Sequence, residues 1–306
     1  MKAIIFAENA LLAKELVAGA QQLGARQIIQ VALGADAIAA ATAEPSGATN
    51  LVTLDVPANF AVENSVASLK TWFAAEQPQL VLSEPTRQLQ IIVGTLAASV
   101  GTSVVSNVES LDASGAQTLY FGGISSRKIK PSTSTAFYAV GSGVFTAGDV
   151  AAASAAAEQS SIAWVEPVMS VELLERTSLS GDNVDLHASN IVISCGRGFT
   201  EKEDLDLAYE LAQKLGAGVG CTRPLAEAVD WFDRGTYIGV TGLMLNPKVF
   251  VSVGASGQTQ HMIGATKSEV IIAINKDGNA PVFKQCDIGI VGDLKQVLPA
   301  LNAALL

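Results

Sequence analysis

Short apolar runs alternate with helical patterns along most of the chain, and in its last third each run ends in a polar or glycine-rich turn. Five such runs are present: Ile191–Cys195, Gly218–Cys221, Val249–Gly254, Val270–Ile274 and Ile288–Val291. Buried parallel strands have this continuous apolar character, and ligands of parallel sheets bind beyond the carboxyl ends of the strands. The pattern therefore predicts a mostly parallel sheet whose turns share one extended ligand.

The first half of the chain has the same alternation and then changes. Strands are predicted at Ala3–Glu8, Gln27–Leu33, Leu51–Val56 and Leu80–Ser83, and helices at Val62–Ala75 and Leu89–Val100. From about Thr118, the segments Leu119–Phe121, Ala136–Val140 and Ile162–Val168 predict an antiparallel region on the edge of this sheet. The polar stretch Ser178–Asn190 is a candidate linker. We therefore expect two doubly wound α/β domains, residues 1–187 with the antiparallel extension and residues 188–306.

Composition narrows the classes of function. The chain has 306 residues, of which 49% are hydrophobic and 16% charged, so it can build large cores. Its net charge of −10 argues against nucleic acid or an anionic membrane as the main partner. The first strand begins almost at Met1 and no apolar run reaches about 18 residues, so we expect a cytoplasmic protein without a membrane span.

The three cysteines do not predict a cofactor site. Cys195, Cys221 and Cys286 lie far apart in the sequence and lack C-x-x-C spacing. Two of them fall at or near strand ends, where buried thiols are common. Neither a structural disulfide nor a zinc site is expected.

Two arginines follow strands in the second domain. Arg197 lies between Gly196 and Gly198, before a helix predicted to begin at Glu201 by the Thr200-to-Glu203 capping-box spacing. Such a turn suits a pyrophosphate or an electron-rich ring, or it is a plain turn with a solvated arginine.

The second arginine lies in the sequence Thr222-Arg223-Pro224. The proline should end the strand and keep Arg223 extended, which would direct its side chain at the carboxyl edge. A surface salt bridge is the alternative.

The turn Ser256–His261 gathers hydrogen-bonding side chains after another strand. Its spacing is not the G-x-S-x-G of a hydrolase elbow, which disfavours serine hydrolysis. His261 either contacts a ligand or is structural. Asn275 and Asp293 follow the last two strands, where they could hold ribose or adenine groups or cap the next helix. The first strand is not followed by G-x-G-x-x-G, the nicotinamide-binding fingerprint.

Six motifs in this order resemble the alpha subunit of an electron transfer flavoprotein. They are SCGRGF (Ser194–Phe199), VGCTRP (Val219–Pro224), YIGVTG (Tyr237–Gly242), SVGASGQTQHMIGA (Ser252–Ala265), AINKDGNAPVF (Ala273–Phe283) and DIGIVGD (Asp287–Asp293). The first domain resembles the family more weakly, through its layout and Tyr120–Gly123. TRPLAE and YIGVT are most similar to the branch associated with nitrogen fixation and carnitine metabolism.

The resemblance implies an electron carrier and not an enzyme with its own catalytic residues or metal. FAD would bind the second domain, and a beta subunit would contact the first and complete a heterodimer. This pair would pass electrons between a dehydrogenase or reductase and another partner such as a quinone oxidoreductase. The implied FAD contacts are Arg197, Thr222, Arg223, Gly239, Val240, Thr241, Ser256, Gly257, Gln258, Thr259, Gln260, His261, Asn275, Asp293 and Leu294.

Two family glutamines are replaced here by Tyr237 and Val240. We hypothesise that Arg223 lies near the redox-active centre of the flavin, with Thr241 donating to N5 or O4 and His261 donating near N1 and C2=O. A nicotinamide-linked flavin oxidoreductase acting alone and a non-redox scaffold with a lapsed flavin pocket remain alternatives. Whether the pair bifurcates electrons is left open.

Overall fold

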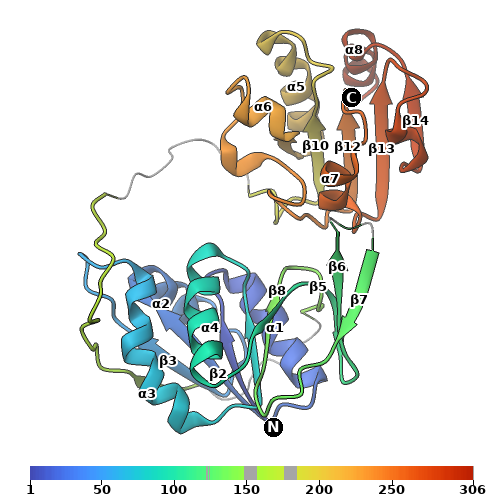
Figure 1. Cartoon of the computed structure of the whole chain (residues 1–306). Helices are drawn as coiled ribbons and strands as arrows, with labels where there is room; N and C mark the ends of the chain where they lie inside the picture. The colour runs from blue at the N-terminus through green and yellow to red at the C-terminus, as the bar shows by residue number, and fades with distance from the viewer. Residues whose placement is uncertain (122, 124, 148–156, 176–184, 306) are drawn as a thin grey trace. The chain divides into compact units, whose positions relative to one another are not determined.

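A computed structural model describes residues 1–121, 123, 125–147, 157–175 and 185–305. The chain forms two compact units: residues 1–120 with 125–178, and residues 121–124 with 179–306 (Figure 1). Part of the predicted linker, residues 178–184, lies outside the described residues. The boundary near residue 187 and the contact of the first domain with a partner remain predictions.

The first unit contains strands β1 to β9 and helices α1 to α4. The strands are β1 (Lys2–Phe6), β2 (Gln27–Leu33), β3 (Asn50–Leu54), β4 (Leu80–Ser83), β5 (Val104–Asp112), β6 (Gly115–Tyr120), β7 (Ser125–Ile129), β8 (Ala136–Val140) and β9 (Glu158–Ser161). The helices are α1 (Ala10–Gln22), α2 (Gly34–Ala43), α3 (Val66–Glu76) after the 3-10 turn η1 (Val62–Ser65), and α4 (Arg87–Ser99).

Its strands form one sheet in the order β7-β6-β5-β8-β4-β1-β2-β3-β9, parallel from β5 to β9 and antiparallel at β6 and β7. This confirms a doubly wound sheet with an antiparallel extension. Two strand predictions were wrong in detail. The run Ala136–Val140 is β8, which lies between β4 and β5 and pairs parallel with both, because its partners are set by the chain crossover and not by its own pattern. The run Ile162–Val168 is not a strand, and the exposed β9 pairs with β3 in its place.

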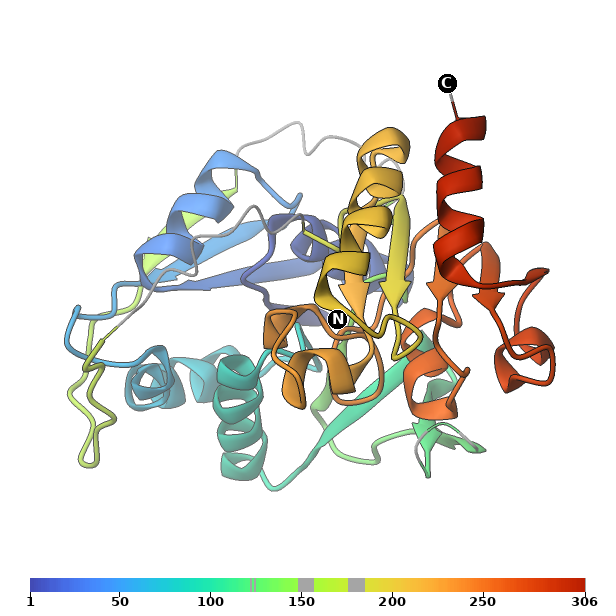
Figure 2. The same ribbon diagram turned by 90° about the horizontal axis from the view of Figure 1, so that it is seen from above.

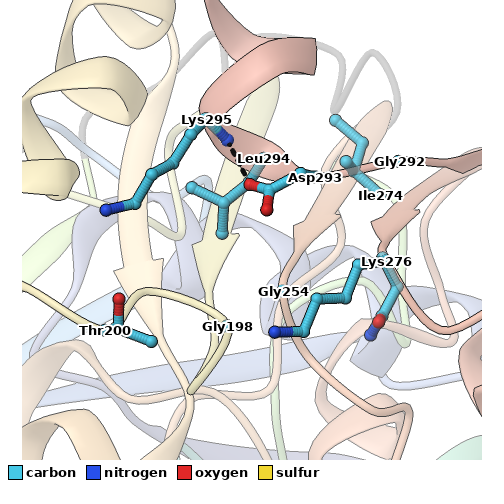
Figure 3. A pocket seen from close by; sticks show the side chains of 10 residues that line it. Gly198, Thr200, Gly254, Ile274, Lys276, Gly292, Asp293, Leu294 and Lys295 are labelled. Carbon is cyan, nitrogen blue, oxygen red and sulfur yellow. Dashed lines mark hydrogen bonds between the residues drawn. The ribbon is translucent and has the colours of Figure 1, made fainter.

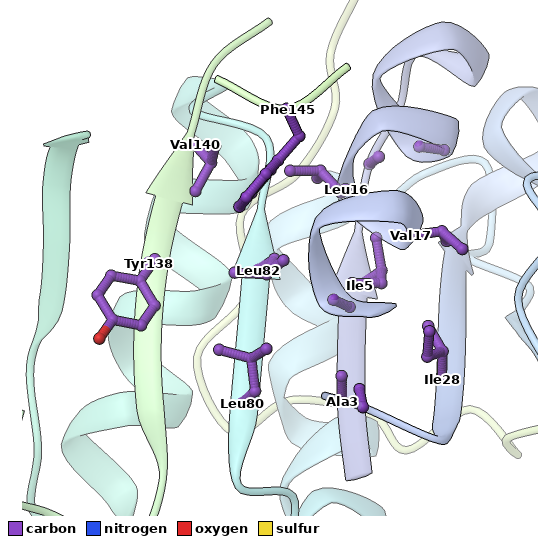
Figure 4. Packing of buried hydrophobic residues seen from close by; sticks show 14 of the residues in the cluster. Ala3, Ile5, Leu16, Val17, Ile28, Leu80, Leu82, Tyr138, Val140 and Phe145 are labelled. Atoms are coloured by element: carbon purple, nitrogen blue, oxygen red, sulfur yellow. The ribbon is translucent and has the colours of Figure 1, made fainter. Parts of the chain in front are cut away.

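Helices cover both faces of the first sheet. On one face, Leu16 and Val17 of α1 pack with Ile5 of β1 and Leu82 of β4 (Figure 4). On the other, α3 and α4 pack on a core that includes Phe6. Alternate residues of β1 therefore serve opposite cores, as a doubly wound sheet requires.

The second unit has a smaller sheet. Its strands are β10 (Ile191–Cys195), β11 (Gly218–Cys221), β12 (Val249–Val253), β13 (Val270–Asn275) and β14 (Ile288–Val291). Its helices are α5 (Leu205–Leu215) after η2 (Lys202–Asp204), α6 (Arg223–Glu227), η3 (Arg234–Thr236), α7 (Thr259–Met262), η4 (Ile263–Ala265), η5 (Pro281–Lys284) and α8 (Leu294–Ala304).

All five strands are parallel, in the order β11-β10-β12-β13-β14, as the apolar runs predict. Helices α5 and α8 lie side by side on one face (Figure 2). The strand order reverses between β10 and β12, and doubly wound sheets bind ligands at this switch point.

One register row of the second sheet consists of small residues. Ser194 of β10 pairs with Gly220 on one side and Ser252 on the other, and the row continues through Ala273 to Gly289. Ser194 and Ser252 are fully buried. Ser194 also contacts His261 of α7, so α7 lies against this row.

Candidate functional site

The loops after β10 and β12 meet at the switch point. The Gly196 N–H donates to the carbonyl of Val253 and the Gly198 N–H to that of Gly254, both at 2.8 Å. A Cβ on Gly196 would lie 2.6 Å from the Ala255 nitrogen, so the backbones can approach this closely only at glycine. These bonds leave the Arg197 side chain exposed at the edge.

The helix after Arg197 begins later than the sequence predicts. Lys202–Asp204 form a 3-10 turn and α5 follows at Leu205. The Glu201 N–H donates to Asp204 at 3.3 Å, so the capping contact lies one residue beyond the predicted Thr200-to-Glu203 pair.

Arg223 is the first residue of α6, and the prediction that it is extended was wrong. Thr222 is the extended residue (φ −79°, ψ 147°), because the chain tolerates Pro224 in the first helical turn, where its missing N–H leaves no bond unmade. The side chain of Arg223 is 59% exposed, and its Nε donates to Glu227 at 2.5 Å. This bond raises the pKa of the Arg223 guanidinium. The surface salt bridge that we considered as the alternative to a ligand-binding role for Arg223 is therefore present.

Thr222, the residue that follows β11, has a side chain that is unsatisfied within the described ranges. Its hydroxyl oxygen is buried and has no hydrogen-bond partner among the described residues. A buried hydroxyl without a partner costs free energy unless a water or a ligand bonds to it. The Ser252 hydroxyl and the Asn302 side-chain oxygen of this domain are in the same state, but Thr222 is the one that lies at the carboxyl edge beside Arg223.

The segment Tyr237–Leu243 runs beside the end of β11. The Ile238 N–H donates to the Cys221 carbonyl at 2.9 Å, and the Tyr237 hydroxyl donates to the Thr241 carbonyl at 2.5 Å. Gly239 has φ of 140°. The side chains of Val240 and Thr241 are exposed.

The backbone of the turn Ser256–His261 is fixed while most of its side chains remain exposed. The Ser256 carbonyl accepts from the Val282 N–H at 3.0 Å and the Gly257 carbonyl from Gln285 at 2.8 Å. Gln260 bonds the preceding segment through its carbonyl, which accepts from the Val240 N–H at 2.9 Å. The exposed side chains are those of Ser256, Gln258, Thr259 and Gln260.

His261 is buried and uses both ring nitrogens within the domain. Nδ1 lies 2.9 Å from the Ile238 carbonyl, which can only accept, so Nδ1 carries the proton. Nε2 lies 3.3 Å from the Ser194 hydroxyl and accepts from it in the neutral ring. Burial lowers the pKa of His261, which favours the neutral form. No ring proton is left for a flavin, so the structure does not support the predicted donation to N1 and C2=O.

A pocket opens at the carboxyl edge between β12, β13 and the start of α8 (Figure 3). Its lining residues are Gly198, Thr200, Gly254, Ile274, Asn275, Lys276, Gly292, Asp293, Leu294 and Lys295. Sequence analysis named Asn275, Asp293 and Leu294 but missed Lys276 and Lys295, although each lysine directly follows a residue that it did name.

The predicted residues of this pocket already form hydrogen bonds or packing contacts within the protein. Asn275 donates to the Ala255 carbonyl at 2.8 Å and accepts from the Asp277 N–H at 3.0 Å. Asp293 caps α8 by accepting from the Lys295 N–H at 2.9 Å, as the helix-cap interpretation predicts. Leu294 is 6% exposed and packs into the core.

The cysteines are free, and Cys195 and Cys221 are buried register partners. Burial raises the pKa of Cys221 to about 12 and that of Cys195 further, so both are unreactive thiols. Among the described residues, no group of three or more His, Cys, Asp or Glu side chains could hold a metal ion. Within the same ranges, no helix combines the length and apolar character needed to cross a bilayer.

Comparison with known proteins identifies the family. Residues 185–266 match the profile described as "Electron transfer flavoprotein FAD-binding domain", and residues 9–167 match "Electron transfer flavoprotein domain". Protein FixB of Escherichia coli O7:K1 (strain IAI39 / ExPEC) is 35% identical over 230 residues, 74% of this chain and 73% of FixB. Protein FixB of strain ED1a is 36% identical over 232 residues, with the same coverage.

The chain belongs to the electron transfer flavoprotein alpha-subunit family. This confirms the predicted cofactor, FAD, and the FixB relatives confirm the predicted branch. The roles of individual site residues remain predictions.

The described residues of this electron transfer flavoprotein domain fit a dinucleotide. The Thr222 hydroxyl lacks a partner among these residues, and Lys276 lines the pocket together with Lys295, whose Nζ forms an ion pair with Asp204 at 2.9 Å. The N-terminal end of α8, an 11-residue helix, adds backbone N–H groups, of which that of Lys295 is already bonded to the capping carboxylate of Asp293. The cations, the amides and the unpaired hydroxyl together suit a polyanionic cofactor with a polar ring.

Proposed function

We propose that this chain forms a heterodimer with an electron transfer flavoprotein beta subunit and carries electrons in the cytoplasm. The electrons would pass from a dehydrogenase or reductase to a separate redox partner. When bound, FAD supplies the one- and two-electron chemistry, and the protein supplies binding, orientation and electrostatics. The chain therefore acts as a carrier and needs no catalytic nucleophile or base.

The observation that carries this proposal is the edge of β11, where Thr222, whose hydroxyl has no partner among the described residues, directly precedes Arg223, whose side chain is exposed. The hydroxyl would bond a polar atom of the flavin, and the cation would favour negative charge on the ring. Arg197 would bind on the other side of the switch point, from the loop after β10.

The neighbouring loops would position the cofactor through their backbone and exposed side chains. The Gly239–Thr241 segment and the Ser256–Gln260 turn would follow the ring and the pyrophosphate. Asn275, Asp293 and Leu294, together with Lys276 and Lys295, would line the ADP end in the pocket. His261 would not contact the cofactor. Its hydrogen bond to the Ile238 carbonyl would hold the backbone of the Gly239–Thr241 segment in place.

The test is co-purification of this chain with its beta subunit, followed by a visible absorption spectrum. We expect a yellow heterodimer whose absorption corresponds to one FAD bound to each alpha subunit. A dehydrogenase should reduce this flavin, and NAD(P)H should not exchange hydride with it directly. Hydride exchange by this chain alone would favour a nicotinamide-linked oxidoreductase. A well-folded heterodimer that stays colourless with excess FAD would contradict the proposal and favour a scaffold.

A further inference from the structure

We propose that Glu227 is a positioning residue for Arg223 and, as its counter-charge, sets the flavin potential below the value that a free arginine would give. The inference rests on the proposed function, because it requires Arg223 to lie near FAD. Glu227 belongs to neither the pocket nor the predicted set of FAD contacts.

The geometry of α6 produces this pair. Arg223 and Glu227 begin and end the helix, so they are four residues apart and share one face. Thr222 is the N-cap residue of α6, without a side-chain capping bond, and Pro224 lies in the first turn, where its ring fixes its own φ. The start of the helix and its only acid are therefore tied to the carboxyl edge of β11.

The contact is made by one edge of the guanidinium. Glu227 accepts from Nε at 2.5 Å, which leaves the terminal nitrogens of Arg223, with the remaining N–H donors, for another acceptor. A carboxylate bound to Nε thus orients the guanidinium of Arg223. It does not compete with a ligand that binds the two terminal nitrogens.

The negative charge of Glu227 reduces the positive potential that Arg223 produces at a ligand near its terminal nitrogens. A negative group that close to the cation cancels part of its field, so a flavin that gains negative charge on reduction is stabilised less. Arg223 can then bind the oxidised cofactor without shifting its potential as far as an unpaired cation would.

A structural role alone does not explain Glu227. Exposed pairs four residues apart contribute little to stability, and the side chains here are 59% and 34% exposed. The chain offers a matched pair of this kind, Lys214 with Glu210 on α5, at 3.6 Å. The two glutamates can therefore be compared by the same charge-removing substitution.

The experiment measures the midpoint potential of the bound flavin in the heterodimer by spectroelectrochemical titration, together with the dissociation constant of FAD. We expect Glu227→Gln to shift the potential to a more positive value, and Glu210→Gln to leave it at the wild-type value. The shift should shrink as salt is raised, because the pair is exposed. In an Arg223→Gln background, Glu227→Gln should still raise the potential but by less, because the carboxylate then acts on the flavin only directly and no longer orients a cation toward it.

The outcomes separate the inference from the proposed function. A wild-type heterodimer that binds no FAD contradicts the proposed function. FAD that binds normally but shows the same potential in the Glu227→Gln and Glu210→Gln proteins overturns the inference alone. A Glu227→Gln protein with a lowered potential, or one that folds and has lost FAD, also overturns it, because the residue would then serve binding and not the balance of charge.

Discussion

The two doubly wound sheets of this chain have opposite arrangements at their switch points. In the first sheet the point lies between β1 and β4, and the carboxylate of Glu84 accepts from the N–H groups of Glu8 and Asn9 at 2.7 and 3.0 Å. Asn9 in turn caps α1. In the second sheet the corresponding edge presents two exposed arginines and the Thr222 hydroxyl, which has no partner in the part of the chain that the structure describes.

The two switch points differ in how the chain uses the polar groups beside them. In the first domain, side chains of the protein itself occupy the amides that an anion would otherwise bind. In the second, the loops after β10 and β12 bond to one another through their backbones, and the side chains of Arg197 and of the Ser256–Gln260 turn are mostly exposed. The later strand ends resemble the first domain, because Asp293 caps α8 and Asn275 bonds to Ala255. The following changes test this contrast, from the largest expected effect to the smallest.

Gly257→Ala should destabilise the second domain by about 3 kcal/mol, since a left-handed backbone and a steric clash act together. Gly257 has φ of 83°, and a Cβ there would lie 2.3 Å from the Val282 nitrogen. Gly24 in the first domain has φ of 90° and open space around it, so Gly24→Ala should cost only about 1 kcal/mol. Urea unfolding measures both. Equal losses would show that the close approach of the two loops is unimportant.

Glu84→Ala should destabilise the first domain by about 1–2 kcal/mol, because two backbone N–H groups lose a charged acceptor. The affinity for FAD should not change. Glu44, which forms an exposed pair with Lys14, provides the control, and its replacement by alanine should change stability by less than about 0.5 kcal/mol. A large loss of FAD binding in Glu84→Ala would contradict the view that this switch point is closed.

Thr222→Val should weaken FAD binding by up to about tenfold, the value of one lost hydrogen bond, while leaving stability within about 0.5 kcal/mol. Thr49 of the first domain provides the contrast, because its hydroxyl donates to the Ile28 carbonyl at 2.8 Å. Thr49→Val should reduce stability and spare FAD binding. Fluorescence titration of FAD and urea unfolding distinguish the two, and unchanged FAD affinity in Thr222→Val would remove this hydroxyl from the site.

Acid should destabilise the second domain through His261, although the effect is the smallest of the four. Burial lowers its pKa in the folded state below the ordinary value of 6.5. The unfolded chain therefore binds more protons in this range, so the stabilisation is full above about pH 6.5 and is lost as pH falls through the lower folded pKa. Urea unfolding between pH 8 and 5.5 should show this slope in wild type and not in His261→Gln. The exposed His187 supplies the control, and a slope that disappears in His187→Gln would refute the assignment.

Much of the fold could be predicted from local pattern. The strands β2, β4, β8, β10 and β11 have the bounds that their apolar runs predict, because buried parallel strands carry their signal in the run itself. The bounds of β14 were also predicted by its apolar run, although it is an exposed edge strand. Pairing could not be predicted in the same way. β8 lies inside the parallel sheet through a long-range crossover, and β9 is a fully exposed edge strand without an apolar signal.

The sequence predicts where polar groups gather better than it predicts their contacts. Asn275 and Asp293, which follow neighbouring strands, do line one pocket, as parallel topology requires, while their contact with FAD stays a prediction. The unpaired state of Thr222 and the internal partners of His261 depend on three-dimensional contacts between distant segments. Glu227 could have been found earlier, because its spacing of four from Arg223 is visible once a helical turn is assumed.

The row of small residues under α7 has a consequence for how this domain can change over time. Ser194, Ser252 and their neighbours make that layer thin, and any bulkier side chain there would lift the helix and move the turn that precedes it. Mutational tolerance should therefore differ between the two sides of one sheet. Substitutions would accumulate beneath α5 and α8, where side chains can be exchanged for others of like volume. The row of small residues beneath α7 would tolerate few substitutions.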